Sequence, residues 1–143
     1  MTAYRRILAA IDLTQDSLAV AARAREIAGT DHGALQLLHV VEVVPLEPMG
    51  DSLAPVIQID QQLTARALKQ MEKLVHDLGL PPDAGHVESG SVKSEILRYA
   101  REFSADLIVL GGRERHGLSI LLHRTEDSVL HGAPCDVLAV RVR

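Results

Sequence analysis

The chain has 143 residues, of which 47% are apolar and only 2% aromatic, and its formal net charge is −4. That length suits one domain, residues 1–143, with a sizeable core that we expect to be built from Leu, Val, Ile and Ala. The lack of a Lys/Arg run and the scarcity of aromatic rings argue against nucleic-acid and anionic-membrane partners. No stretch approaches the roughly 20 apolar residues of a membrane-spanning helix.

Five short apolar runs are predicted to be strands: residues 7–12, 34–41, 85–88, 106–111 and 136–142. The first, second and fourth are almost continuously apolar, which is typical of parallel strands covered on both faces. The last run alternates between two sides, as an edge strand or a pairing surface would. Its two sides carry Val137, Ala139 and Arg141, and Leu138, Val140 and Val142.

A helix is predicted after the first strand. Thr14 or Asp16 is a candidate cap for a helix that ends at Gly29. Residues 44–57 carry three prolines and are expected to form a long surface loop. For this loop we favour a mobile surface over a functional lid.

Three further helices are predicted in the second part of the chain. One repeats apolar residues at helical spacing over residues 63–78 and is stopped by Gly79 and Pro81. The next follows Ser91 as its N-cap, with Glu95 in the first turn. The last covers residues 120–131, before Gly132 and Pro134.

The alternation of strands and helices predicts an α/β fold with an open parallel sheet and right-handed crossovers. Such sheets bind ligands beyond the carboxyl ends of their strands. The site is therefore expected between Asp12, at the end of the first strand, and the loop that begins at Gly111. Asp12 is a candidate ligand for a ribose hydroxyl or a base amino group, and equally a cap for the following helix.

The glycine pair Gly111-Gly112 allows close backbone approach to a phosphate, although an ordinary turn explains it as well. The chain has neither the G-x-x-x-x-G-K-[ST] phosphate loop nor G-x-G-x-x-G after the first strand. None of the seven histidines forms a metal-ligand pair, and no nucleophile–base set is visible. We therefore expect no metal and no enzyme activity.

Cys135 is the only cysteine, so an internal disulfide is excluded. Together with the absence of a signal-peptide pattern, this predicts a reducing, cytoplasmic location. Cys135 opens an apolar strand and is expected to be a buried structural thiol.

The chain resembles the universal stress protein family over nearly its full length. The similar blocks are ILAAIDLT (residues 7–14), LLHV (residues 37–40), ADLIVLG (residues 105–111), the run from RHGL (residues 115–118) to SVL (residues 128–130), and APCDVLAV (residues 133–140). Five blocks in the right order make the resemblance specific.

The resemblance implies a Rossmann-like sheet ordered 3-2-1-4-5, of the adenine nucleotide alpha hydrolase-like fold. It also implies a homodimer paired through residues 137–142. In many members an adenine nucleotide lies at the switch point of the sheet. The positions that match the ribose and adenine side of that pocket are Asp12 and Val40, with Ala10 as a neighbouring wall.

The phosphate side of the family pocket is a loop with three spaced glycines, the last followed by a hydroxyl residue. Gly111 fits the first glycine, but Glu114, His123 and Arg124 stand at the second glycine, the third glycine and the hydroxyl. A carboxylate there repels phosphate. Two expectations follow: a dimeric, non-catalytic stress-response regulator acting through protein partners, or an AMP- or ATP-binding switch. The residues left to hold phosphate are Thr125 and the cationic side chains of Arg113, Arg115 and Arg124.

Overall fold

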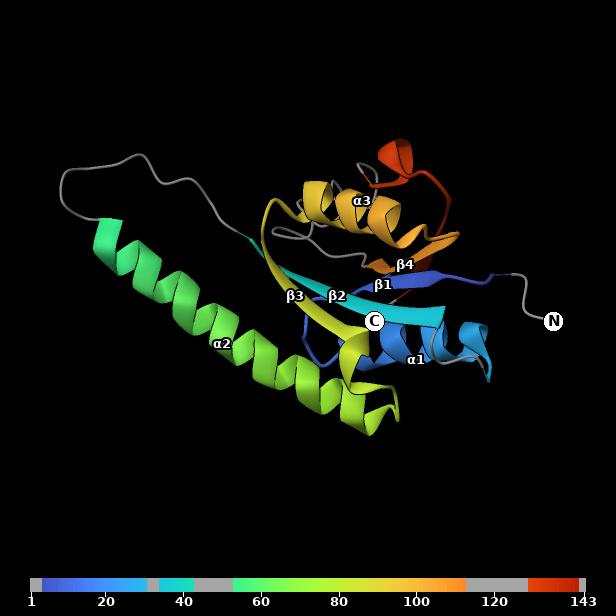
Figure 1. The fold of residues 1–143 in the computed structure, drawn as a ribbon, viewed down its shortest axis with the longest axis horizontal. Coiled ribbons are helices and arrows are strands. Elements are labelled where there is room, and N and C mark those ends of the chain that lie inside the picture. Colours follow the sequence, from blue (N-terminus) through green and yellow to red (C-terminus); the bar gives the residue numbers. More distant parts are fainter. Residues whose placement is uncertain (1–3, 31–33, 43–52, 113–128, 142–143) are drawn as a thin grey trace.

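A computed structural model describes residues 4–30, 34–42, 53–112 and 129–141 of the chain. A single sheet lies between helices that cover both of its faces (Figure 1). The elements in chain order are β1 (Ile7–Ala10), α1 (Ser17–Ala28), β2 (Leu35–Glu42), α2 (Leu53–Asp77), the short 3-10 helix η2 (Pro82–Ala84), β3 (Gly85–Gly90), α3 (Val92–Phe103), β4 (Leu107–Gly112) and β5 (Asp136–Arg141).

The five strands run parallel in the order β3-β2-β1-β4-β5, which confirms the predicted fold class and strand order. β1 is central, and Ala10 lies beside Leu38 of β2 and Leu110 of β4. The chain moves outward to β2 and β3 on one side of β1, and then returns to β4 and β5 on the other. The carboxyl end of β1 is therefore the point where the strand order reverses.

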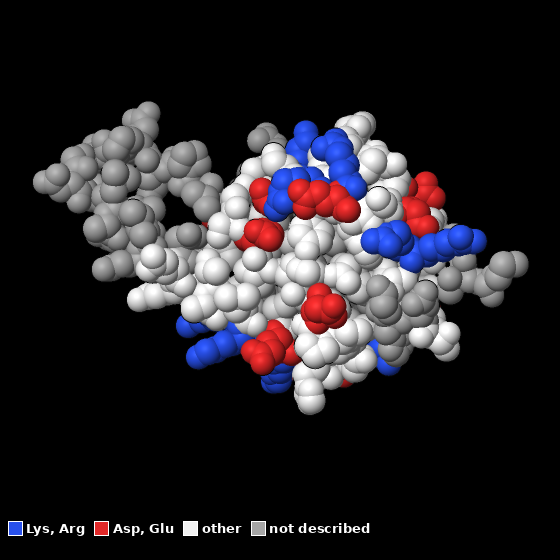
Figure 2. All heavy atoms as spheres, viewed as in Figure 1, with Lys and Arg blue, Asp and Glu red and all other residues white. Residues whose placement is uncertain are grey.

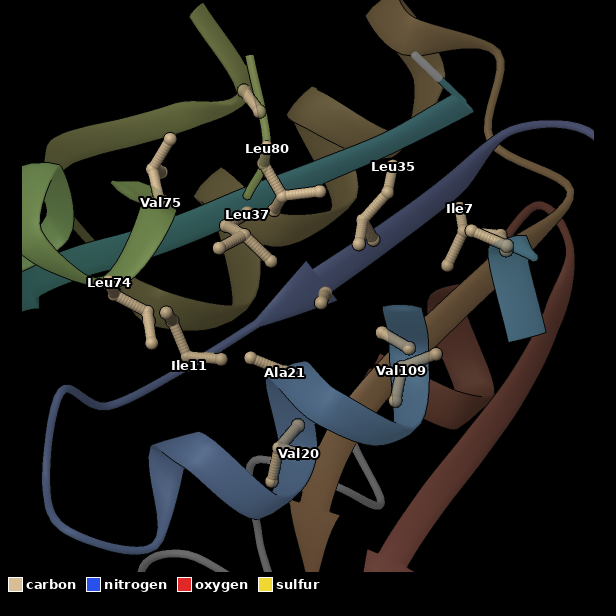
Figure 3. Packing of buried hydrophobic residues seen from close by; sticks show 14 of the residues in the cluster. Ile7, Ile11, Val20, Ala21, Leu35, Leu37, Leu74, Val75, Leu80 and Val109 are labelled. Atoms are coloured by element: carbon tan, nitrogen blue, oxygen red, sulfur yellow. The ribbon is translucent and has the colours of Figure 1, made fainter. Parts of the chain in front are cut away.

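One face of the sheet is covered by α1 and α2. Val20 and Ala21 of α1 and Leu74 and Val75 of α2 belong to the hydrophobic core on this face, which Figure 3 shows. The buried positions of α1 are mostly small, and this lets its backbone lie close to the strands. The cluster also includes Ile7, Ala9, Ile11, Leu35, Leu37 and Val109 from the sheet and its edge.

The other face is covered by α3, as Figure 1 shows. Leu8, Leu38 and Ile108 are fully buried there, and they pack with Ile96, Leu97, Ala100 and Val129. Alternate residues of β1 thus enter two separate cores, Leu8 into this one and its neighbours Ile7 and Ala9 into the other. Burial on both faces explains why the strand was recognised as a continuous apolar run.

Helix α2 is longer than expected. It begins at Leu53, so the prediction of a loop over residues 44–57 is wrong for residues 53–57, whereas residues 44–52 lie outside the described residues. Pro55 favoured the prediction of a loop. It is the third residue of the helix, however, and the backbone N–H groups of the first turn have no helical partner. The helix stops near Gly79, whose φ of 68° is of the kind that glycine adopts without strain.

The predicted caps have different outcomes. Ser91 accepts from the Ser94 backbone N–H at 3.5 Å, as expected for the N-cap of α3. Asp16 occupies the N-cap position of α1, as one of the two alternatives predicted, but it makes no side-chain capping bond. The Thr14 hydroxyl donates to Asp12, which also accepts from the Thr14 backbone N–H and the Ser17 hydroxyl.

The fourth predicted helix falls mostly outside the described residues. Residues 129–132 are helical, in agreement with its end, and residues 120–128 are not described. The last strand is an edge strand, as one of the two alternatives for it required.

The amino ends of the central strands are joined by long-range hydrogen bonds. The carboxylate of Asp106 accepts from the backbone N–H groups of Arg5 at 2.7 Å and Arg6 at 2.9 Å. The Asp106 backbone N–H donates to the Arg6 carbonyl at 2.8 Å. The Tyr4 hydroxyl donates to Asp136 at 2.9 Å. These bonds connect the start of β1 with the starts of β4 and β5.

Candidate functional site

The turn after β1 is built around the carboxylate of Asp12. β1 ends at Ala10 rather than at residue 12, so Asp12 lies outside the strand and is exposed. Its Oδ1 accepts from the Thr14 backbone N–H at 3.1 Å, the Thr14 hydroxyl at 2.7 Å and the Ser17 hydroxyl at 3.0 Å. This is an Asx turn extended onto the first residue of α1. The N-cap of α1 is Asp16, so Asp12 stabilises the turn before the helix rather than capping the helix, and its role toward a ligand stays a prediction.

Leu13 follows in the left-handed conformation, with a φ of 59°. This region costs a residue with a Cβ about 1 kcal/mol or more. The Leu13 side chain packs against the core beneath α1 and α2. The strained residue is therefore held between a hydrogen-bonded turn and a hydrophobic contact.

A side chain of β2 contacts the same turn. Nδ1 of His39 lies 2.8 Å from the carbonyl oxygen of Ile11. A carbonyl oxygen only accepts, so Nδ1 carries the proton in this bond. The Ile11 backbone N–H also donates to the Leu38 carbonyl at 2.9 Å. Both polar backbone groups of Ile11 are thus bound to β2, although β1 has already ended.

The positions matched to the adenine wall lie on the α3 side of the sheet. Val40 is only 8% exposed and belongs to the core beneath α3, and Ala10 packs against that core. Since β2 and β1 are neighbours, both positions lie near the carboxyl edge of the sheet. Little of the Val40 side chain is accessible in this conformation.

Gly111 and Gly112 are both part of β4, paired with Val140 and Arg141 of β5. The prediction that the loop begins at Gly111 is therefore wrong, because the strand extends through Gly112. The remaining predicted phosphate residues lie outside the described residues: Arg113, Glu114, His123, Arg124 and Thr125. Of the candidate site, the structure places Ala10, Val40 and Gly111 on the neighbouring strands β1, β2 and β4, and Asp12 in the turn that follows β1.

Sequence reasoning missed a polar contact between α3 and the sheet. The His86 ring stacks at a tilt on Tyr99, with ring centroids 4.9 Å apart, and its Nε2 hydrogen-bonds Gln36. Burial lowers the pKa of His86, against the opposing charges of Glu88 and Asp83. Burial also raises the pKa of Tyr99. No motif marked these residues, because the contact depends on how α3 crosses the sheet.

Charged side chains are mixed rather than gathered into one basic face. Figure 2 shows blue and red side chains next to each other over the described part of the surface. Arg98 of α3, for example, contacts Glu95 at 2.5 Å and Glu102 at 3.0 Å. Exposed pairs of this kind contribute little to stability.

Other candidate chemistry is sparse in the described residues. They contain no group of three or more His, Cys, Asp or Glu side chains placed to hold a metal ion. Cys135 is half-buried, and burial raises the pKa of its thiol, so it is a poor nucleophile. A groove of about 790 Å³ follows one side of α2, over Met71, Val75 and Gly85. Of the predicted nucleotide residues that the structure describes, none lines this groove.

A membrane-spanning helix is also absent from the described part of the chain. The open parallel sheet, with helices on both faces and a polar turn at its switch point, defines a Rossmann-like α/β protein.

Comparisons with known proteins agree with this class and narrow it. Residues 3–141 match the model of the universal stress protein family. The chain is 38% identical over 138 residues to Universal stress protein A homolog 1 of Coxiella burnetii, covering 96% of each chain. The chain therefore belongs to the universal stress protein family.

Solved structures show the same fold. The universal stress protein UspA from Lactobacillus plantarum superposes with a TM-score of 0.75 at 23% identity, and 99% of each chain is covered. A universal stress protein in complex with cAMP superposes with a TM-score of 0.68 at 21% identity, again over 99% of each chain.

Proposed function

We propose that this chain is a non-catalytic stress-response regulator that acts as a homodimer through protein partners. The observation that carries the proposal is the match to the universal stress protein family over residues 3–141. The relative from Coxiella burnetii is matched along 96% of its length.

The dimer is proposed to pair through residues 137–142. In the described sheet β5 pairs with β4 on one side only. Leu138 is 37% exposed, while Val137 and Val140 are half-buried. An edge strand with apolar side chains is a template for pairing with a second strand. A second copy of β5 would cover these side chains.

The absence of catalysis is proposed from the chemistry of the site. The Asp12 carboxylate at the switch point already accepts three hydrogen bonds through Oδ1 from its own turn. An acceptor in that position suits positioning better than proton transfer. On the phosphate side, Glu114, His123 and Arg124 replace the family's glycines and hydroxyl in the sequence. We therefore propose that tight ATP binding is lost.

A second candidate function is an adenine-nucleotide switch, in which AMP or ATP fills the pocket near Asp12 and Gly111. It is favoured by the neighbour that was solved in complex with cAMP. It is also favoured by the fixed orientation of the Asp12 carboxylate at the switch point, where parallel sheets bind ligands. Under this proposal Asp12 accepts from the ribose, and Ala10 and Val40 contact the base. Arg113, Arg124 and Thr125 would contact phosphate.

Calorimetric titration of the purified chain with ATP, ADP and AMP separates the two functions. The regulator predicts no ATP binding at micromolar concentrations, and micromolar ATP binding would contradict it. AMP binding without ATP binding would support two conclusions: that the Asp12 side still binds adenosine, and that the altered phosphate side no longer holds a triphosphate. If a nucleotide binds, Asp12→Ala is expected to remove the binding, whereas Asp16→Ala, which removes a charge from the same turn, is expected to keep it.

The dimer has a separate test. Arg141→Glu places a charge of opposite sign on β5 without altering a buried side chain. We expect this variant to sediment as a weaker dimer, and Arg101→Glu, an exposed change on α3, to sediment like the parent. An unchanged dimer in Arg141→Glu would count against an interface at this position.

A further inference from the structure

We infer that His39 is a positioning residue for the Asp12 side of the site, because its imidazole N–H holds the Ile11 carbonyl and so fixes the turn that carries Asp12. The part of this inference that concerns ligand affinity rests on the nucleotide pocket proposed above. The part that concerns the turn does not, since it follows from contacts within the chain.

The chain needs support where it leaves the sheet. β1 ends at Ala10, while its neighbour β2 continues to Glu42. Ile11 lies beyond the end of the ladder, yet its backbone N–H donates to Leu38 at 2.9 Å and its carbonyl accepts from His39 Nδ1 at 2.8 Å. His39 therefore extends the attachment of β1 to β2 by one residue, through a side chain.

His39 is well placed for this role. It lies in the interior of an eight-residue strand, and its neighbours in the sequence, Leu38 and Val40, are both buried. Its backbone is paired in register with Val87 of β3. A short side chain with two rotatable bonds, mounted on such a strand, loses little entropy when it holds one geometry.

The bond to Ile11 acts directly on Asp12. The Ile11 carbonyl and the Asp12 N–H belong to the same planar peptide group, so fixing the carbonyl fixes the direction in which Asp12 departs. The Ile11 side chain points into the core beside Leu74 and Ala21 (Figure 3), which restrains the residue a second time. Asp12 is thus held from the β2 side before the turn begins.

The other side of the turn is held by α1. Oδ1 of Asp12 accepts from Thr14 and from the buried hydroxyl of Ser17. Between these two attachments lies Leu13 in the left-handed conformation. A strained residue persists only when its surroundings determine it. Release of the His39 attachment should therefore let Leu13 relax and let the carboxylate of Asp12 rotate away.

The test compares three variants of His39. His39→Leu keeps the bulk but has no donor. His39→Asn places its amide nitrogen on Cγ, where Nδ1 is attached, and so preserves the donor. His39→Gln keeps the amide but moves it one methylene further out. His76→Leu, at an exposed histidine of α2, is the control for loss of an imidazole.

The first measurement is hydrogen exchange at the Thr14 amide, which donates to Asp12 Oδ1. In the ligand-free protein we expect the rate to rise about tenfold in His39→Leu, as for the loss of one hydrogen bond, and to stay near that of the parent in His39→Asn. Unchanged exchange in His39→Leu overturns the inference. If His39→Leu does not fold, a difference between His39→Asn and His39→Gln supports the inference and equal rates overturn it.

The second measurement is the affinity for AMP in the same set. We expect the Kd to rise about tenfold in His39→Leu and to stay within about threefold in His39→Asn. AMP binding by the parent with equal affinity in both variants contradicts the effect on the ligand. If the parent binds no AMP, the proposed pocket fails, and hydrogen exchange alone decides whether His39 positions the turn.

Discussion

The two ends of the sheet are stabilised by different kinds of contact. At the amino end, Asp106 and Asp136 accept hydrogen bonds from Tyr4, Arg5 and Arg6, residues that are 100 or more positions away in the sequence. At the carboxyl end, Asp12 accepts from Thr14 and Ser17, which lie within five residues of it. There two hydrogen bonds attach Ile11 to β2, one to the Leu38 carbonyl and one from His39.

The difference implies that contacts at the amino end act on the stability of the fold, whereas contacts at the carboxyl end also act on ligand binding. Long-range bonds at the amino end link three strands that the chain must bring together, so they act on the folded state as a whole. Local bonds at the carboxyl end shape one turn, at the edge where open parallel sheets bind ligands. Changes at the amino end should therefore reduce the free energy of unfolding and spare binding, and changes at Asp12 should affect both.

The largest effect is expected from Asp106→Ala. It removes the acceptor of two backbone N–H groups that join β1 to β4. Hydrogen bonds to charged groups contribute more than neutral ones, and we expect a loss of about 2–3 kcal/mol in the free energy of unfolding, measured in urea. Asp106→Asn, which keeps one acceptor oxygen, should lose less. Equal stability of Asp106→Ala and the parent would remove the distinction between the two ends.

The next effect is expected from Asp12→Ala. The change takes the acceptor from the Thr14 amide and from the Ser17 hydroxyl, which is only 4% exposed. We expect a loss of about 1–2 kcal/mol in the same measurement, as for other lost helix-entry acceptors. Asp12→Asn should recover part of this loss. A loss greater than that of Asp106→Ala would mean that the carboxyl end, rather than the amino end, dominates stability.

A smaller effect of opposite sign is expected from Ser104→Gly. Ser104 ends α3 just before β4 and has a φ of 56°. Glycine adopts this conformation without the Cβ contact that strains serine, so the change should stabilise the fold by about 0.5–1 kcal/mol. Its midpoint of urea unfolding should rise. A lower midpoint would show that the serine hydroxyl contributes more than the backbone strain costs.

The smallest expected effect is a dependence of the free energy of unfolding on pH, caused by His86, the second residue of β3. Because burial lowers its pKa in the fold, the unfolded chain binds the proton more readily. Stability should therefore rise with pH from below the folded pKa up to the ordinary value of 6.5, and be flat above it. Urea unfolding at pH values on both sides of that window measures the slope. His86→Gln should reduce it, and a slope unchanged in this variant would assign it to another group.

How much of this could be read from the sequence depends on the range of the interaction. The five strands and the parallel class followed from continuous apolar runs such as residues 107–110, because burial on both faces leaves no polar position. Ser91 could be predicted as a cap because its side chain binds a backbone N–H only three residues further along the chain. The resemblance to the universal stress protein family supplied the strand order, which the pattern of apolar residues alone leaves open.

The errors came from elements whose ends depend on neighbours. Pro55 suggested a loop, yet the first turn of a helix tolerates proline, so α2 begins earlier. Gly111-Gly112 suggested a turn, but pairing with β5 keeps both residues in β4. Asp16 is the N-cap of α1 but makes no side-chain capping bond, and the hydroxyl of Ser17, the first residue of the helix, donates to Asp12.

The sequence by itself determined which segments are buried, that Asp12 lies between the first strand and the first helix, and which residues replace the phosphate-loop glycines. These are properties of composition and short spacing. Only the tertiary structure decided that His39 holds Ile11, that His86 meets Tyr99 and that Asp106 binds the start of the chain. Such contacts join residues far apart in the sequence, and they exist only because the parallel sheet brings their strands side by side.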